Sequence, residues 1–164
     1  PNLAALAGWF LDYTSPILIV CDFDNVESTV RQMIRMGFDN LPGFLNGGMT
    51  AWAVAGKPLE TSKTLTVDQF CEVVKADTPK LMLDVRGEDE LVGEGLKNAT
   101  RIQLVKLSEY LDEIPKDRPI FTLCGRGNRS MTAASILKRK DFDKVVSLKG
   151  GLSAWEAYNC DFEL

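Results

Sequence analysis

The residues that follow one cysteine have the types and spacing in this sequence that best suit a reactive thiolate. Cys124 ends an apolar run, and the six residues after it, GRGNRS, supply two glycines and two arginines before a predicted helix. Gly125 and Gly127 allow positive φ and leave the backbone N–H groups free to surround one point. The helix N-terminus adds partial positive charge, and Arg126 and Arg129 add full charges. This combination favours the thiolate and would equally hold a further anionic sulfur on Cys124.

Histidine is absent from all 164 residues. A Cys–His or Ser–His–Asp nucleophile within the chain is therefore excluded, as is a histidine-ligated metal site, and we predict no metal and no cofactor. The net charge of -4 argues against a general nucleic-acid or anionic-membrane surface. Four cysteines without a C-x-x-C pair fit a reducing, cytoplasmic setting with free thiols better than a disulfide scaffold.

Strand and helix signals alternate over the second part of the chain. Thr66 is an N-cap candidate for a helix over 65–76. Further strands are predicted at 80–86, 100–105, 119–124 and 144–149, with helices at 107–114, 128–140 and 151–158. Such alternation predicts an α/β fold with a mostly parallel sheet. Sites in open α/β sheets form at the C-terminal ends of strands, which is where Cys124 stands.

The first third of the chain repeats part of this pattern. The segment PILIVCDFDN (16–25) matches PIFTLCGRGN (119–128), and FDNLPGFLNGGMTAW (38–52) matches FDKVVSLKGGLSAW (142–155). Strands at 17–20 and 40–45 and helices at 26–36 and 48–54 are predicted there. We therefore predict a partial second copy over 1–56, a polar linker over 57–64 and a complete domain over 65–164.

The corresponding loop in the first copy lacks the two glycines and the second arginine of the Cys124 loop. It reads CDFDNVES, with Asp22 and Asp24 in place of the two glycines and Val26 in place of the second arginine. Carboxylates next to Cys21 oppose an anionic sulfur, so we interpret this copy as degenerate, with a structural or partner-binding role. Because the copy lacks the earlier strands, we expect an exposed apolar sheet edge or sheet face that favours self-association.

Three motifs, in this order, resemble the rhodanese domain of sulfurtransferases. LMLDVRGEDEL (81–91) is similar to the family's L-D-V-R strand-end motif, and CGRGNRS (124–130) is similar to its C-x-x-G-x-R active-site loop. LKGGLSAW (148–155) is similar to its L-x-G-G-x-x-x-W ending. The resemblance covers approximately residues 60–164. It implies a five-stranded parallel sheet with helices on both sides.

The resemblance also implies an activity. A sulfurtransferase of this family would carry sulfane sulfur as a persulfide on Cys124, loaded from thiosulfate or a low-molecular-weight persulfide and removed by a thiophilic acceptor such as a thiol or cyanide. The implied substrate-binding loop consists of Gly125, Arg126, Gly127, Asn128, Arg129 and Ser130. Asp84 and Arg86 carry over by motif, and we interpret them as a buried ion pair that holds the base of the loop rather than as catalysts.

Cysteine phosphatases that share the fold need five residues between cysteine and arginine, whereas four separate Cys124 from Arg129, so phosphatase activity is disfavoured. A buried structural cysteine at an ordinary strand-to-helix turn remains the non-catalytic alternative. A degenerate unit before an intact one is similar to the C-terminal region of metallo-β-lactamase-fold proteins fused to rhodanese domains, including persulfide dioxygenases. That resemblance implies an upstream metallohydrolase domain, for which both units would serve as a regulatory scaffold.

Cys71 and Cys160 lie outside the active-site loop. Cys71 lies among apolar residues of the first helix of the complete domain and is predicted to be core. Cys160, near the end of the sequence, is predicted to be exposed, and whether it or Cys21 relays sulfur is left open.

Overall fold

A computed structural model describes residues 3–90, 96–158, 160–162 and 164. The chain divides into two compact units, Pro1–Glu60 and Thr61–Leu164, called here the first and the second unit. Within the described ranges, no helix combines the length and the apolar character that crossing a membrane requires.

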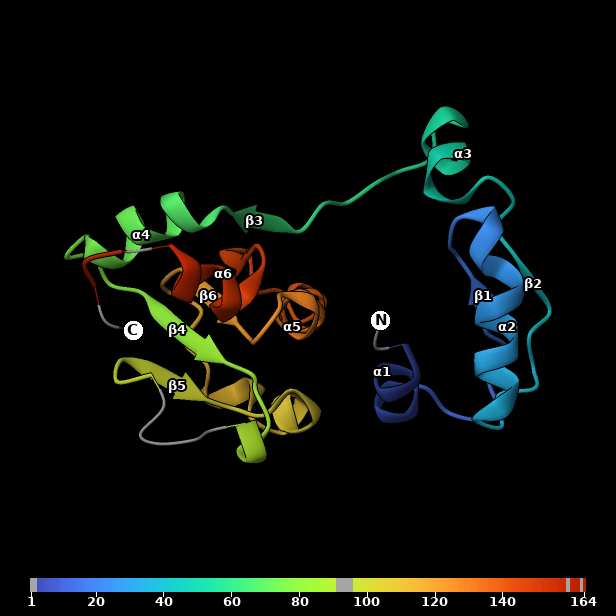
Figure 1. Cartoon of the computed structure of the whole chain (residues 1–164), viewed down its shortest axis with the longest axis horizontal. Coiled ribbons are helices and arrows are strands. Elements are labelled where there is room, and N and C mark those ends of the chain that lie inside the picture. Colours follow the sequence, from blue (N-terminus) through green and yellow to red (C-terminus); the bar gives the residue numbers. More distant parts are fainter. Residues whose placement is uncertain (1–2, 91–95, 159, 163) are drawn as a thin grey trace. The chain divides into compact units, whose positions relative to one another are not determined.

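The second unit is an α/β domain built on one parallel sheet (Figure 1). Its elements are β3 (Lys63–Leu65), α4 (Val67–Lys75), β4 (Leu81–Asp84), η2 (Glu88–Glu90), β5 (Ala99–Arg101), η3 (Leu104–Glu109), η4 (Leu111–Glu113), β6 (Ile120–Leu123), α5 (Asn128–Lys138), β7 (Val145–Leu148) and α6 (Gly151–Ala157). The strand order is β3-β7-β6-β4-β5, and every pairing is parallel. The predicted five-stranded parallel sheet flanked by helices is confirmed.

Alternation along the central strands assigns the helices to the two faces of the sheet. On one face, Phe121 and Leu123 of β6 pack with Phe70 of α4 and Leu152 of α6 in one apolar cluster. The opposite face of β6 meets α5, because the Thr122 hydroxyl donates to the Ser130 carbonyl at 2.9 Å. Both faces of the central strands are thus covered, as expected for a parallel sheet whose strands are continuous apolar runs.

The start of α4 follows the predicted capping pattern. Thr66 is the N-cap, and with Gln69 it forms a reciprocal capping box. Two predictions in this unit need correction. The segment predicted as a linker over 57–64 runs into the sheet, because Lys63 and Thr64 belong to β3 and pair with β7. The helix predicted over 107–114 is instead two short 3-10 helices, η3 and η4.

The 3-10 geometry of η3 follows from which leucines are buried. Leu104 and Leu107, three positions apart, are both buried, whereas the residues between them are exposed. Side chains at i and i+3 eclipse each other in a 3-10 helix, so this turn directs both leucines into the core.

The first unit is smaller and contains a two-stranded parallel sheet. Its elements are α1 (Leu3–Phe10), β1 (Leu18–Ile19), η1 (Phe23–Asn25), α2 (Val26–Arg35), β2 (Gly43–Phe44) and α3 (Gly48–Val54). Four of them lie inside the predicted strands and helices, whereas α1 and η1 were not predicted. Ala7, Met33 and Phe38 form the buried cluster. That this unit is a partial copy of the second stays a prediction.

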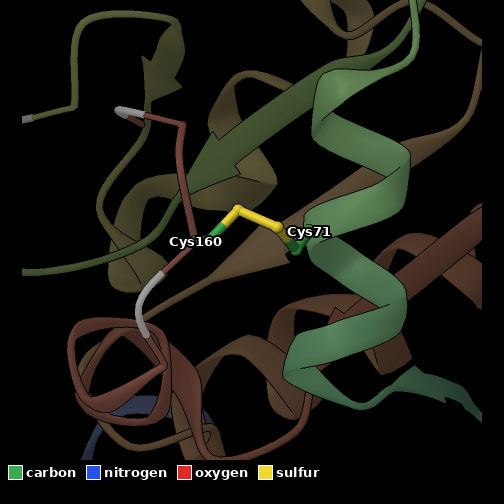
Figure 2. The surroundings of a disulfide bond; sticks show 2 residues. All are labelled: Cys71 and Cys160. Carbon is green, nitrogen blue, oxygen red and sulfur yellow. A yellow bond between two sulfur atoms is a disulfide. The ribbon is translucent and has the colours of Figure 1, made fainter.

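A disulfide joins Cys71 of α4 to Cys160 near the end of the chain, with 6.1 Å between their Cα atoms (Figure 2). Cys71 is buried, as predicted, but the prediction of four free thiols is wrong: only Cys21 and Cys124 are free. Cys160 is half-buried rather than exposed. In the disulfide it has no thiol with which to accept sulfur.

Candidate functional site

The Cys124 side chain is surrounded by its own loop directly after β6. The residue is 1 % exposed, and its Sγ accepts hydrogen bonds from the backbone N–H of Gly127 at 3.1 Å and of Ser130 at 3.3 Å. The second of these amides belongs to the first turn of α5. Two amide donors and a helix N-terminus thus face the sulfur, as the composition of the loop predicted.

The two loop glycines have different roles. Gly127 has φ 94° and is the N-cap of α5, so the chain turns in the left-handed region where a side chain is costly. Gly125 does not have positive φ, so of the two loop glycines only Gly127 uses the left-handed conformation that glycine allows. A Cβ at Gly125 would find ordinary contacts, the nearest being an Arg129 nitrogen at 3.7 Å.

The first residues of α6 form backbone hydrogen bonds with the Cys124 loop. The N–H of Leu152 donates to the Cys124 carbonyl at 2.8 Å, and the N–H of Ser153 donates to the Gly125 carbonyl at 2.9 Å. Gly151 makes this approach possible, because a Cβ there would lie 2.3 Å from the Cys124 carbonyl oxygen. The loop conformation therefore depends on a second glycine turn that comes after β7.

Arg129 does not point at the sulfur as a free cation. Its guanidinium forms a two-point ion pair with Glu90 of η2, in which Nη2 lies 2.6 Å from Oε2 and Nη1 contacts Oε1. This hydrogen bond lowers the pKa of the Glu90 carboxyl to about 2 and raises the pKa of Arg129. Glu90 also accepts the N–H of Gly87 at 3.0 Å, so the ion pair ties η2 to the start of α5.

Asp84 and Arg86 form the predicted ion pair at the end of β4. Asp84 is buried, and Arg86 contacts its carboxylate through Nε at 2.9 Å and Nη2 at 2.6 Å. The hydrogen bond to Asp84 raises the pKa of Arg86. Because the two side chains bind each other, a positioning role fits the pair better than proton transfer.

Buried hydroxyls lie behind the sulfur. Ser147 of β7 donates to the Oγ of Ser130 at 2.8 Å, and the Ser130 hydroxyl donates to the Gly127 carbonyl at 2.9 Å. The Sγ of Cys124 lies 3.5 Å from the same Ser130 Oγ. The sulfur therefore meets two backbone amides and the Ser130 hydroxyl, and Ser147 holds that hydroxyl from β7.

Comparison with known proteins identifies the family. A profile of the Rhodanese-like domain matches residues 66–158, which is more than half of the chain and includes the whole Cys124 loop. The chain belongs to the rhodanese-like family.

Individual relatives agree with this assignment. The chain is 33% identical over 79 residues to thiosulfate sulfurtransferase GlpE of Coxiella burnetii, covering 48% of this chain and 74% of that protein. It is 34% identical over 95 residues to the putative sulfurtransferase YtwF of Bacillus subtilis, covering 57% and 90%. The crystal structure of a rhodanese-related protein from Thermoplasma volcanium superimposes with a TM-score of 0.52 at 26% identity, covering 58% of this chain and 91% of that one.

The rhodanese-like domain brings together most of the predicted site residues. All seven residues from Cys124 to Ser130 form the loop and the first turn of α5, with Arg126 and Asn128 exposed on its outside. Three further residues were missed: Glu90, Ser147 and Gly151. Gly151 had a signal in the repeated Gly-Gly before tryptophan, whereas Glu90 and Ser147 had none that separates them from their neighbours. Leu91, the last residue of the first motif, lies outside the described residues.

Cys21 of the first unit has different surroundings. It is partly exposed and is followed by the 3-10 helix η1, in which the N–H of Asn25 donates to the Asp22 carbonyl at 2.9 Å. Among the residues that the structure describes, no amide donates to its sulfur. Only the rhodanese-like domain of the second unit holds a cysteine in an amide-lined loop.

Proposed function

We propose that the second unit is a sulfurtransferase that carries sulfane sulfur as a persulfide on Cys124. The observation that carries this proposal is the pair of backbone amides, of Gly127 and Ser130, directed at the Cys124 Sγ. Amide donors and a helix N-terminus favour negative charge on sulfur, and they do so without a histidine. The loop is therefore suited to a thiolate before transfer and to a persulfide after it.

The loading step balances without a cofactor. With thiosulfate as the donor, the Cys124 thiolate attacks the outer, sulfane sulfur, and a bond forms between Sγ and that atom. The S–S bond within thiosulfate breaks, its electron pair leaves with sulfite, and the sulfane sulfur keeps its negative charge as the terminal sulfur of the persulfide. Attack by a thiolate or cyanide on that terminal sulfur then restores Cys124.

An anionic donor is favoured by the charge on the outside of the loop. Arg129 is neutralised by Glu90, but Arg126 is exposed, and within the described part of the chain no carboxylate bonds to it. Arg126 is therefore the cation available to meet the sulfonate of thiosulfate or the carboxylates of a peptide persulfide. The relatives named thiosulfate sulfurtransferase support the first of these donors.

The test is intact-protein mass spectrometry after brief incubation with thiosulfate and, separately, with glutathione persulfide. We expect a gain of one sulfur, about 32 Da, that cyanide discharges. Cys124→Ser should abolish the gain. Cys21→Ser is the matched control because it removes the other free thiol, and it should retain the gain.

Two results of this experiment would contradict the sulfurtransferase proposal. If neither donor loads the protein, or if the adduct persists in Cys124→Ser, the sulfurtransferase proposal is wrong. The first result would favour the alternative of a folded, non-catalytic scaffold. Hydrolysis of p-nitrophenyl phosphate by wild type but not by Cys124→Ser would favour a phosphatase instead.

A further inference from the structure

The hydroxyl of Ser130 has its full set of hydrogen bonds while Cys124 is a thiol. A serine hydroxyl offers one donor and two acceptor sites. Its O–H donates to the Gly127 carbonyl, one lone pair accepts the Ser147 hydroxyl, and the Cys124 S–H can donate to the other across 3.5 Å. Ser130 and Ser147 are both buried, so no bulk water substitutes for these partners.

Loss of the thiol proton changes this arrangement. An anionic sulfur has no S–H, so a Ser130 oxygen whose lone pair faces it becomes unfavourable. Rotation about one bond turns the Ser130 O–H from the Gly127 carbonyl to Sγ. The Ser147 hydroxyl still occupies a lone pair of Ser130 and holds the oxygen in place from β7. The sulfur then has three donors: the two backbone N–H groups and the Ser130 hydroxyl.

We propose that Ser130 and Ser147 form a buried hydroxyl switch that accepts a hydrogen bond from the Cys124 thiol and donates one to its thiolate. The expected effect on sulfur loading rests on the proposed function. Ser147 touches no reacting atom and is a positioning residue. Thr122 cannot replace it, because the Thr122 hydroxyl is occupied by the Ser130 carbonyl at 2.9 Å.

The charged groups around the loop act separately from this switch. Arg129, paired with Glu90, stands at the start of α5, and Arg126 is exposed on the loop. Asp84 and Arg86 pair with each other at the end of β4. None of these side chains contacts Ser147 in the described structure, so replacing Ser147 removes one hydroxyl and leaves the charges unchanged.

The test measures Cys124 alkylation against pH in the full chain carrying Cys21→Ser, with sulfur loading from thiosulfate as a second rate. In Ser147→Ala, we expect the pH midpoint of alkylation to rise and loading at pH 7 to slow about three- to ten-fold, because a donor to the anion is less well held. Ser147→Thr keeps a hydroxyl and should restore both. Thr122→Val is the matched control, since it removes an equally buried hydroxyl that does not reach the sulfur.

The pH midpoint of alkylation tests the hydroxyl switch, and sulfur loading tests the proposed function. An unshifted midpoint in Ser147→Ala, or an equal shift in Thr122→Val, overturns the switch, because the effect would then be absent or merely structural. A shifted midpoint in Ser147→Ala alone supports it. Alkylation does not require sulfur transfer, so a wild-type protein that fails to load thiosulfate overturns the proposed function while the alkylation midpoint still decides the switch.

Discussion

Glu90 and Arg129 lie 39 positions apart in the sequence and meet in a two-point ion pair beside the Cys124 loop. The pair joins the segment after β4 to the first turn of α5. It therefore connects the carboxyl ends of two neighbouring strands, β4 and β6, where the cysteine lies. Its geometry leaves Arg129 as a structural cation and Arg126 as the exposed one.

Replacing Glu90 by glutamine should loosen the loop. The Arg129 and Glu90 side chains are 19% and 36% exposed, so solvent screens the pair, and we expect the free energy of unfolding to fall by about 1 kcal/mol. Hydrogen exchange of the β6 amides in urea would measure this fall in the free energy of unfolding. Glu88→Gln is the matched control: Glu88 is more exposed and lies 3.4 Å from Lys106, and its replacement should change stability little. An equal loss in both variants would contradict a special role for Glu90.

The contribution of Glu90 should disappear in acid. Its pKa is lowered from 4.5 to about 2 in the folded state by the hydrogen bond from Arg129. A group with a lowered folded pKa stabilises the protein above its unfolded pKa, and this stabilisation is lost as pH falls through the folded pKa. The stability difference between wild type and Glu90→Gln should therefore be constant above about pH 5 and shrink between about pH 4.5 and pH 2. A difference that does not change with pH would show that charge is not its cause.

Gly151→Ala should displace the active-site loop. The new Cβ would lie 2.3 Å from the Cys124 carbonyl oxygen and 2.7 Å from the Gly127 nitrogen, at φ 63°. We expect a loss of at least about 2 kcal/mol and a change in Cys124 reactivity toward iodoacetamide. Gly56→Ala isolates the cost of the dihedral angle, since Gly56 has φ 65° with open space around it, and should cost about 1 kcal/mol. Equal losses at the two glycines would argue against the steric conflict.

Reduction of the Cys71–Cys160 disulfide should destabilise the second unit. The two cysteines are separated by 89 positions, a loop for which the chain-entropy account gives about 4.6 kcal/mol as an upper figure. Thermal unfolding with and without a phosphine reductant measures this loss, and a Cys71→Ala, Cys160→Ala variant should not respond to the reductant. Thiol titration of the denatured, unreduced wild type should find two thiols, Cys21 and Cys124. Four thiols without reduction would contradict the disulfide.

Self-association remains a prediction, and it now has a defined surface. Leu18 of β1 and Phe23 of η1 are 70% and 69% exposed, and Val20 and Phe44 of β2 are exposed as well, with the ring centroids of Phe23 and Phe44 6.3 Å apart. Exposed apolar sheet residues favour association, so sedimentation velocity should show concentration-dependent oligomers that Leu18→Asp weakens. Val105→Asp, at an exposed valine of the second unit, is the control. Monomers at all concentrations would contradict the prediction.

Local patterns determined the order of elements and the position of the cysteine. Apolar runs, the Thr66 cap and the Gly-Gly turns act over a few residues, so they could be read before any tertiary contact was known. The sequence predicted a strand over 100–105 and a helix over 107–114, whereas β5 ends at Arg101 and the 3-10 helix η3 begins at Leu104, because the local geometry depends on how the core receives Leu104 and Leu107.

Tertiary structure alone decided the long-range partners. Nothing in the acidic run Glu88, Asp89, Glu90 distinguishes the residue that binds Arg129, and nothing in the spacing of Cys71 and Cys160 indicates that they meet. Both pairings follow from the way distant segments of the chain are brought together by the fold. The same strand order, β3-β7-β6-β4-β5, places β7 beside β6 and so brings Ser147 behind the sulfur. Side chains far apart in sequence become neighbours only when the sheet has formed, which is why the sequence predicted the cysteine loop but not the residues that hold it.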